Sequence, residues 1–198
     1  MRKIMIATAL LVAGIFVTNM SKGQQTWTVD KAHSSVNFTI QHLVISEVDG
    51  TFTDFDGKMV SPSVDFSNAK IDFTVNVASV NTDNENRDAH LKADDFFNAE
   101  KFPKMTFTGV SFKKINEKKY ELTGDLTIRD VTKRVKFDVH YGGTVKDPWG
   151  NTKAGFKATT TINRFDYNLK WNSVTEMGGA VAGSDVSITV KVEFALQK

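Results

Sequence analysis

Polar and apolar residues alternate along most of this 198-residue chain, and the alternation restricts its fold more than any other feature. In the run 186–196, apolar residues occupy every even position, and serine, threonine, lysine and glutamate occupy the first four odd positions. A period of two places successive side chains on opposite faces of a β-strand. Similar runs lie at 36–40, 71–77, 105–112, 120–128, 135–141 and 154–162. The pattern predicts an all-β protein whose sheet has one apolar face and one wet face.

The connections between these runs are short, which predicts hairpins and an antiparallel sheet. Turn-forming residues lie at 56–57, 116–117, 129–132, 142–143 and 149–151. Seven or eight such strands can bury their apolar faces by closing into a barrel or by stacking as a sandwich, and the alternation does not separate the two. On the apolar face, Gly124, Ala154 and Ala158 are small. They either leave room along a barrel axis or accommodate neighbouring phenylalanines in a filled core.

The period of two breaks between Arg87 and Phe107, where the sequence reads RDAHLKADDFFNAEKFPKMTF. Arg87, His90, Leu91, Asp94 and Asp95 fall at helical spacing, and paired phenylalanines and a proline follow. A helical segment inside an otherwise β chain is expected to cover or close part of the sheet.

The first 23 residues have the features of a secretory signal peptide. Arg2 and Lys3 precede an apolar run of 14 residues, Ile4–Val17, and Ser21 and Gly23 offer the small residues of a cleavage site. The run is too short for a comfortable membrane span. We therefore expect a signal peptide at 1–23, one domain at 24–198, and a periplasmic or secreted protein that is not an integral membrane protein.

Charge and cysteine content exclude several kinds of function. Three of the 25 lysines and arginines lie in the predicted signal peptide, which leaves 22 basic against 23 acidic side chains. A chain with no basic excess is not expected to bind nucleic acid. Cysteine is absent, so thiol catalysis and thiolate metal sites are excluded.

No recognisable active-site motif occurs in the sequence. The four histidines, at 33, 42, 90 and 140, do not have the spacing of a metalloprotease motif. No nucleophile elbow, glycine-rich phosphate loop or calcium loop is present either. We expect a binding protein with no bound metal, and not an enzyme.

Five collinear segments of the chain resemble the YceI-like family. They are WTVDKAHSSVNFTIQHL, RDAHLKADDFFNAEKFPKMTF, LTGDLTIRDVTKRVKFDV, INRFDYNLKW and AGSDVSITVKVE. These segments occur in the family's order, and the resemblance extends over essentially all of residues 26–196. The resemblance implies a lipocalin-like, extended eight-stranded antiparallel β-barrel that one short helical segment caps. It also implies an exported carrier that holds a long apolar isoprenoid lipid, either an isoprenoid quinone or a polyprenyl chain, in an internal tunnel. No other cofactor is expected.

Alternate residues of a strand face the same side of the sheet, and we call this strand parity. Together with the resemblance, strand parity selects the residues expected to line the tunnel. They are Phe38, Ile40, Phe52, Phe73, Val75, Phe107, Leu126, Phe137, Phe156 and Trp171. For each, packing in a filled core is the alternative to ligand contact.

Five cationic or titratable residues are candidates for binding a polar lipid head. They are Arg87, His90, His42, Arg129 and Arg164. The alternative for Arg87 and His90 is that they hold the helical segment against the barrel, and arginines at strand ends commonly tie loops together.

Two other functions and one assembly state stay open from the sequence. The ligand can instead be a fatty acid or fatty amide. The protein can also be an enzyme that acts on a lipid head group through Arg87 and His90. A homodimer is compatible with the sequence.

Overall fold

The computed structural model describes residues 23–176 and 178–198. The predicted signal peptide, residues 1–23, therefore lies outside the described residues except for Gly23. In the described part of the chain, no helix is long and apolar enough to cross a membrane. The strands are β1 (Gln25–Val29), β2 (Ser35–His42), β3 (Ser46–Phe52), β4 (Phe55–Ser61), β5 (Lys70–Asn76), β6 (Val80–Asn81), β7 (Lys104–Lys114), β8 (Lys119–Ile128), β9 (Val131–Lys146), β10 (Thr152–Asn163) and β11 (Ala182–Leu196).

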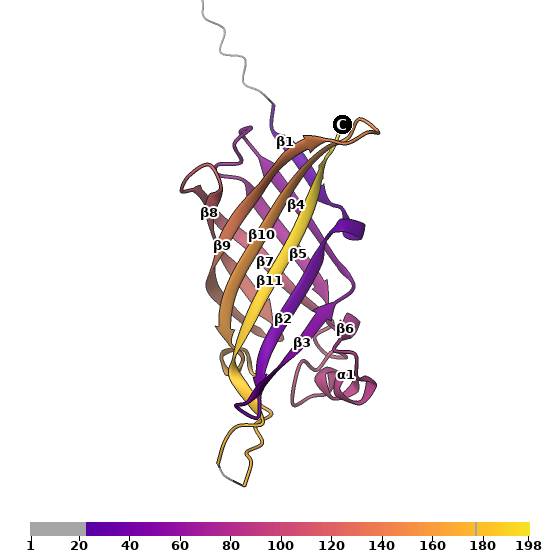
Figure 1. Cartoon of the computed structure of the whole chain (residues 1–198), viewed down its shortest axis with the longest axis vertical. Helices are drawn as coiled ribbons and strands as arrows, with labels where there is room; N and C mark the ends of the chain where they lie inside the picture. Colours follow the sequence, from indigo (N-terminus) through magenta and orange to yellow (C-terminus); the bar gives the residue numbers. More distant parts are fainter. Residues whose placement is uncertain (1–22, 177) are drawn as a thin grey trace, which may run out of the picture.

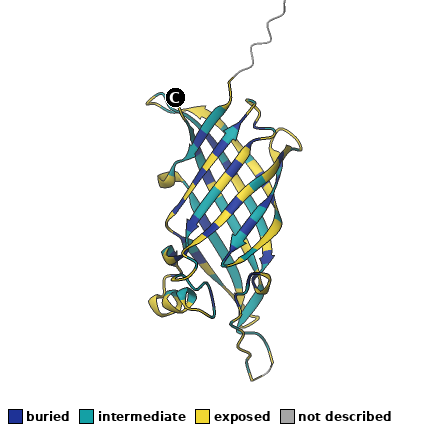
Figure 2. Ribbon diagram, turned by 180° about the vertical axis from the view of Figure 1, so that it is seen from behind, coloured by how far each residue is buried: buried dark blue, intermediate teal, exposed yellow. Residues whose placement is uncertain are grey.

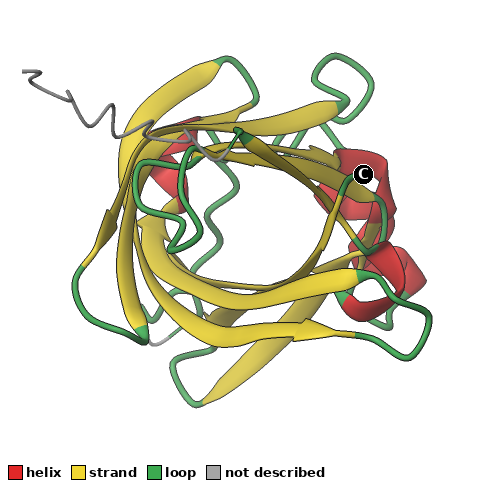
Figure 3. Ribbon diagram, turned by 90° about the horizontal axis from the view of Figure 1, so that it is seen from above, coloured by secondary structure: helices red, strands yellow, loops and turns green. Residues whose placement is uncertain are grey.

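All strand pairs are antiparallel, and the sheet closes on itself because β1 pairs with both β4 and β11. The closed ring is β1, β4, β5, β7, β8, β9, β10 and β11. After a short 3₁₀ turn, η1 (Lys31–His33), the chain runs from β1 into β2, and both strands pair with β11. β3 pairs with β2, and the chain then runs into β4, which pairs with β1. The view along the axis shows the resulting ring (Figure 3). The predicted eight-stranded antiparallel barrel is confirmed.

The barrel has a closed end and a lid end. At the closed end, where β1 begins and β11 finishes, the connection between β4 and β5 folds inward and buries Phe66. The Phe66 ring lies 5.3 Å from Trp27, 5.2 Å from Phe156 and 5.6 Å from Tyr141, measured between ring centroids. These large aromatic side chains fill the closed end.

At the lid end, residues 85–103 form a lid segment, which consists of α1 (Glu85–Lys92) and the turns that follow it. α1 begins where the Asn84 side chain accepts a hydrogen bond from the backbone N–H of Arg87 (3.0 Å). It lies beside β6 and β3 (Figure 1). The helix is shorter than the predicted helical spacing, because Asp94 and Asp95 lie in turns after it.

Two of the predicted turns are wrong. Residues 56–57 lie inside β4, and residues 142–143 lie inside β9. Gly57 is a strand residue that faces the Phe73 ring across the sheet. At 142–143 the strand does not reverse. Instead, the pairing of β9 with β10 shifts its register between Gly155 and Phe156, and this irregularity is a β-bulge.

Candidate functional site

The barrel encloses a cavity of about 210 Å³. Its lining comes from every strand of the sheet except β1 and β6, together with the lid segment and the turn after β10. In the part of the chain that the structure describes, three lining residues, Asn37, Thr106 and Arg164, are polar or charged, and all the others are apolar. Buried and exposed residues alternate along the strands (Figure 2), so the alternation seen in the sequence is the alternation between cavity and water.

Nine of the ten residues predicted by strand parity lie around this one cavity. They are Phe38, Ile40, Phe52, Phe73, Val75, Phe107, Leu126, Phe137 and Phe156. Trp171 does not line it: its ring stacks on Phe96 (5.4 Å) and meets His90 edge-on (5.6 Å). Trp171 lies in a loop, where strand parity does not determine the direction of a side chain.

Other lining residues were not predicted although their signal is present. In β11, Val186, Ile188, Val190, Val192 and Phe194 all line the cavity. They occupy alternate positions, and so one face, of the strand with the clearest alternation in the sequence. Leu169 lies in the turn after β10 and has no periodic signal.

Glycines opposite phenylalanines shape the cavity wall. Phe38 pairs directly with Gly50, and Phe73 pairs directly with Gly57. A Cβ atom on either glycine would overlap the facing ring, so each ring covers the inner side of its glycine. Gly124 receives the Phe107 ring in the same way. Gly124 therefore accommodates a neighbouring phenylalanine, and a cavity still remains inside the barrel.

The lid segment closes the other end of the cavity with Leu91, Phe96 and Phe97, which all line it. Arg129 fastens this segment to the barrel. Its Nη1 donates to the carbonyls of Asp94 (2.7 Å), Phe96 (2.6 Å) and Asn168 (3.0 Å). Arg129 is thus a structural tie between the lid segment and the loop after β10.

Arg87 and His90 also hold the lid segment and do not line the cavity. The Arg87 guanidinium donates to the side-chain and backbone oxygens of Thr82, at 2.7 and 2.6 Å. The His90 Nε2 lies 2.8 Å from an Asp95 carboxylate oxygen. Both arrangements agree with the structural alternative for these residues. His42, at the end of β2, does not line the cavity either.

Among the described residues, Arg164 is the one charged residue that lines the cavity. It is 3% exposed, and its guanidinium donates to four backbone carbonyls, those of Gly183 (2.7 Å), Trp171 (2.6 Å), Leu169 (3.0 Å) and Ala182 (3.2 Å). No carboxylate of the described residues forms an ion pair with it, and burial lowers the pKa of Arg164 from its ordinary value. A buried cation thus stands at the lid end of an apolar cavity.

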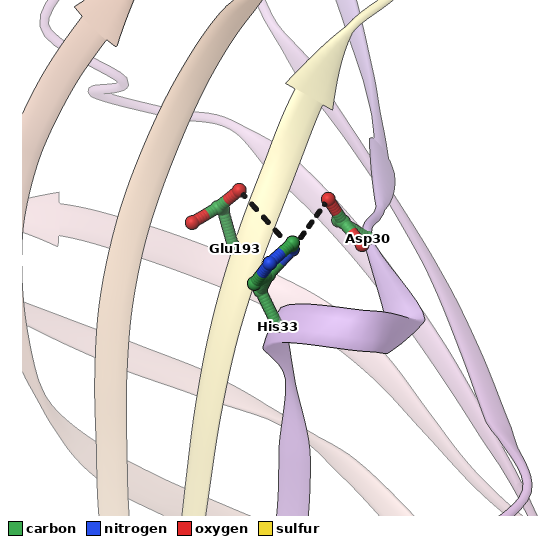
Figure 4. Close-up of side chains that lie close together, drawn as sticks. All are labelled: Asp30, His33 and Glu193. Carbon is green, nitrogen blue, oxygen red and sulfur yellow. Dashed lines mark hydrogen bonds and ion pairs between the residues drawn. The ribbon is translucent and has the colours of Figure 1, made fainter. Parts of the chain in front are cut away.

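A titratable cluster lies on the outside of the barrel, where η1 meets β11 (Figure 4). The His33 Nδ1 is 3.0 Å from an Asp30 oxygen and 3.9 Å from a Glu193 oxygen. Three such groups could hold a metal ion. The Lys153 ammonium already bridges both carboxylates, at 2.5 and 3.4 Å, so the protein supplies the cation itself. The cluster ties β1 and η1 to β10 and β11.

This cluster makes stability depend on pH. Its hydrogen bonds from Lys153 first and His33 second lower the pKa of Asp30 to about 2. A carboxylate with a depressed pKa stabilises the fold above the pKa of the unfolded chain, and this contribution is lost as the pH falls toward 2. The Asp30 side chain also caps η1, because it accepts a hydrogen bond from the backbone N–H of Ala32 (3.1 Å), and an asparagine can keep this bond. We expect Asp30→Asn to lower the free energy of unfolding near pH 7 by about 1–2 kcal/mol.

Urea unfolding of both proteins between pH 2 and pH 7 measures this contribution. The difference between them should shrink below pH 4, because the wild-type carboxylate then becomes protonated in the unfolded chain. A difference that stays constant over the whole range would contradict the assignment.

Known proteins share this sequence and this architecture. The family model of the YceI-like domain matches residues 27–194. A UPF0312 protein of Staphylococcus aureus (strain MSSA476) is 40% identical over 173 residues, which cover 87% of this chain and 98% of that protein.

Two solved structures have the same fold. The YCEI protein of Campylobacter jejuni is 38% identical, with a TM-score of 0.69 over 86% of this chain and 97% of that one. A polyisoprenoid binding domain from Saccharophagus degradans has a TM-score of 0.65 over 86% of this chain and 98% of that one, at 14% identity. The family model and the S. aureus relative each span most of the chain, and the chain therefore belongs to the YceI-like family.

Proposed function

We propose that this protein binds and carries a long apolar isoprenoid lipid, such as an isoprenoid quinone or a polyprenyl chain, inside its barrel. The observation that carries the proposal is the long apolar lining of the cavity. Along β11 alone, the lining residues run from Val186 to Phe194, a rise of about 26 Å. An elongated space of this kind suits a linear chain better than a compact metabolite.

The energetics of such binding favour a water-insoluble ligand. Burying apolar surface contributes roughly 25 cal/mol per Å², and nearly every lining side chain is apolar. A ligand without polar groups along its length leaves no buried donor or acceptor unpaired. The likeness to a fold described as a polyisoprenoid binding domain supports the same ligand class.

The two ends of the cavity differ, which gives the ligand a direction. The closed end is filled by Phe66 and its aromatic neighbours, so the apolar tail points there. The lid end holds Arg164, which is the charged residue among the described lining residues. We place the polar head of the lipid at the lid end, where a donor can orient it. We also propose that the carrier works in the periplasm or outside the cell, as its N-terminal sequence suggests.

Native mass spectrometry of the purified protein, before and after solvent extraction, tests the proposal. We expect a bound lipid in the untreated protein and uptake of menaquinone or ubiquinone by the extracted protein. A fatty acid or fatty amide as the retained ligand would replace the isoprenoid by another lipid class. Protein that is ligand-free and takes up neither quinone nor polyprenol would contradict carriage of isoprenoid lipids.

A further inference from the structure

Two neighbouring loops expose aliphatic side chains at the lid end of the barrel. Val44 and Ile45, at the tip of the β2–β3 hairpin, are 57% and 86% exposed, and Leu43 beside them is partly exposed. Val174, in the loop before β11, is 64% exposed. The loops touch, because the backbone N–H of Leu43 donates to the carbonyl of Val181 (2.9 Å). We refer to Leu43, Val44, Ile45 and Val174 as the apolar tip.

The hairpin holds these residues in an unfavourable backbone conformation. Leu43 and Val44 have φ angles of +52° and +65°. Hairpin turns with two consecutive positive φ angles favour Asn-Gly, and a β-branched residue such as Val44 is strained in this conformation. The sequence thus keeps aliphatic side chains where polar ones would fold more easily. Strain that the fold does not need points to a role for these side chains outside the fold.

The apolar tip stands at the mouth of the cavity. Ile40 lines the cavity and lies on β2, directly before the hairpin. The loop that holds Val174 is tied at its base by Arg164, which binds the carbonyls of Trp171 and Ala182. Beside it, the pairing of β2 with β11 is irregular between Ala182 and Val186. Figure 1 shows both loops projecting past the strands at the end that holds α1.

We infer that the apolar tip inserts into the surface of a lipid bilayer and places the cavity mouth against the membrane that supplies the lipid. The inference rests on the proposed lipid-carrier function. In this arrangement the ligand passes between bilayer and barrel with little exposure to water, which lowers the cost of transfer.

The charge and shape of the apolar tip favour a bilayer as its partner. They also indicate that the contact does not depend on anionic lipid. Residues 43–46 carry no charge, and Glu176 is the one charged residue in 171–181. The exposed charges nearest to the hairpin along the chain, Glu47 and Asp49, are acidic, so anionic lipid would not strengthen the contact. Four aliphatic side chains on projecting loops are far less than a stable protein interface needs. A bilayer requires no matching surface.

The closed end of the barrel offers a contrast. Its exposed apolar residues, among them Val64, Ile115 and Trp149, stand singly on three different connections between strands. Single exposed apolar residues are common on soluble proteins and form no continuous patch. They serve here as controls.

The test is sedimentation with phosphatidylcholine vesicles, using a variant that should fold at least as well as the wild type. Leu43→Asn/Val44→Gly/Ile45→Ser places the preferred Asn-Gly pair in the turn and removes three apolar side chains. We expect wild-type protein to bind the vesicles, with little effect of added salt, and the variant to bind at least about tenfold more weakly. Ile115→Ser should bind like the wild type.

Lipid uptake separates this inference from the proposed function. The triple variant should take up detergent-dispersed menaquinone normally and acquire it from vesicles more slowly. Wild-type protein that does not sediment with vesicles, or a triple variant that sediments equally well, would overturn the membrane contact. Vesicle binding without uptake of any isoprenoid lipid would instead overturn the carrier function and leave the membrane contact standing.

Discussion

Replacing Arg164 with alanine is expected to lower the free energy of unfolding by about 3–4 kcal/mol, the largest loss of stability that we predict for one side chain. The guanidinium is buried and binds four backbone carbonyls, on the turn after β10 and at the start of β11. Without it, these carbonyls lose their donors in a region with limited access to water, and each unpaired buried group is costly. Arg164→Lys should recover little of the loss, because an ammonium cannot reproduce the planar fork of donors.

Arg134→Ala is the matched control for this change. Arg134 also forms two short hydrogen bonds, to the Asp125 carboxylate at 2.6 and 3.1 Å, but both side chains are largely exposed. Surface pairs of this kind typically contribute less than about 1 kcal/mol. Urea unfolding of the wild type, Arg164→Ala and Arg134→Ala measures both losses of stability. A loss for Arg164→Ala no larger than that for Arg134→Ala would show that Arg164 does not hold the loops together.

Replacing Gly50 with valine is expected to reduce lipid binding by at least about tenfold while the barrel still folds. The inner side of Gly50 is covered by the Phe38 ring, and the three atoms nearest to an added Cβ all belong to that ring. The ring, and not the backbone, must therefore move. Its free direction is into the cavity, which measures only about 210 Å³, so the displaced ring occupies space that the lipid needs. The cost of overpacking should be about 1–3 kcal/mol.

A second substitution tests this explanation directly. Phe38→Ala added to Gly50→Val removes the displaced ring and should restore much of the binding. Gly155→Val is the control, because a Cβ at Gly155 meets no atom within 4 Å. Binding is measured by titration with menaquinone, and folding by thermal unfolding. If Gly50→Val binds lipid like the wild type, the cavity beside Phe38 is not the binding site.

The strands could be predicted because alternation reports directly on a sheet with one wet face. β8 was predicted to within one residue at each end, because it alternates throughout. In β11 the prediction began at Val186, four residues after the strand starts, because the regular pairing with β2 begins there. The glycine positions were harder to interpret. Glycine at 57 and at 142–143 is compatible with a turn by local propensity, yet all three residues lie inside strands. There the contacts across the sheet override the local preference.

In the candidate site, too, residues on strands could be predicted from the sequence, and residues in loops and turns could not. Nine of the ten residues expected to line a tunnel lie around the cavity, because inward direction follows from position along a strand. Trp171 was misplaced because it lies in a loop. Arg87, His90 and Arg129 were candidates for binding a head group, but the Arg87 guanidinium binds Thr82, the His90 Nε2 contacts Asp95, and the Arg129 Nη1 binds the lid backbone. The partners of Arg129 lie 33 to 39 residues away in the chain, so no local pattern records them. Thr82 and Asp95 lie only five residues from Arg87 and His90, but the direction of side chains in turns does not follow from periodicity.

By itself, the sequence determined the class of fold, the position of most strands and the apolar character of the inner face, since these depend on local periodicity. Periodicity left barrel and sandwich open; the family resemblance implied closure, and the tertiary structure shows it. Only the tertiary structure decided that one end is filled by Phe66 while the other is covered by the lid segment, and that Arg164 is a charged residue at the cavity. Closure depends on pairing between β1 and β11, whose paired residues, such as Val29 and Phe194, lie at opposite ends of the described chain. Loop placement depends on side-chain contacts that no periodicity records. Periodicity describes which side of a strand meets water, and only packing determines what the dry side encloses.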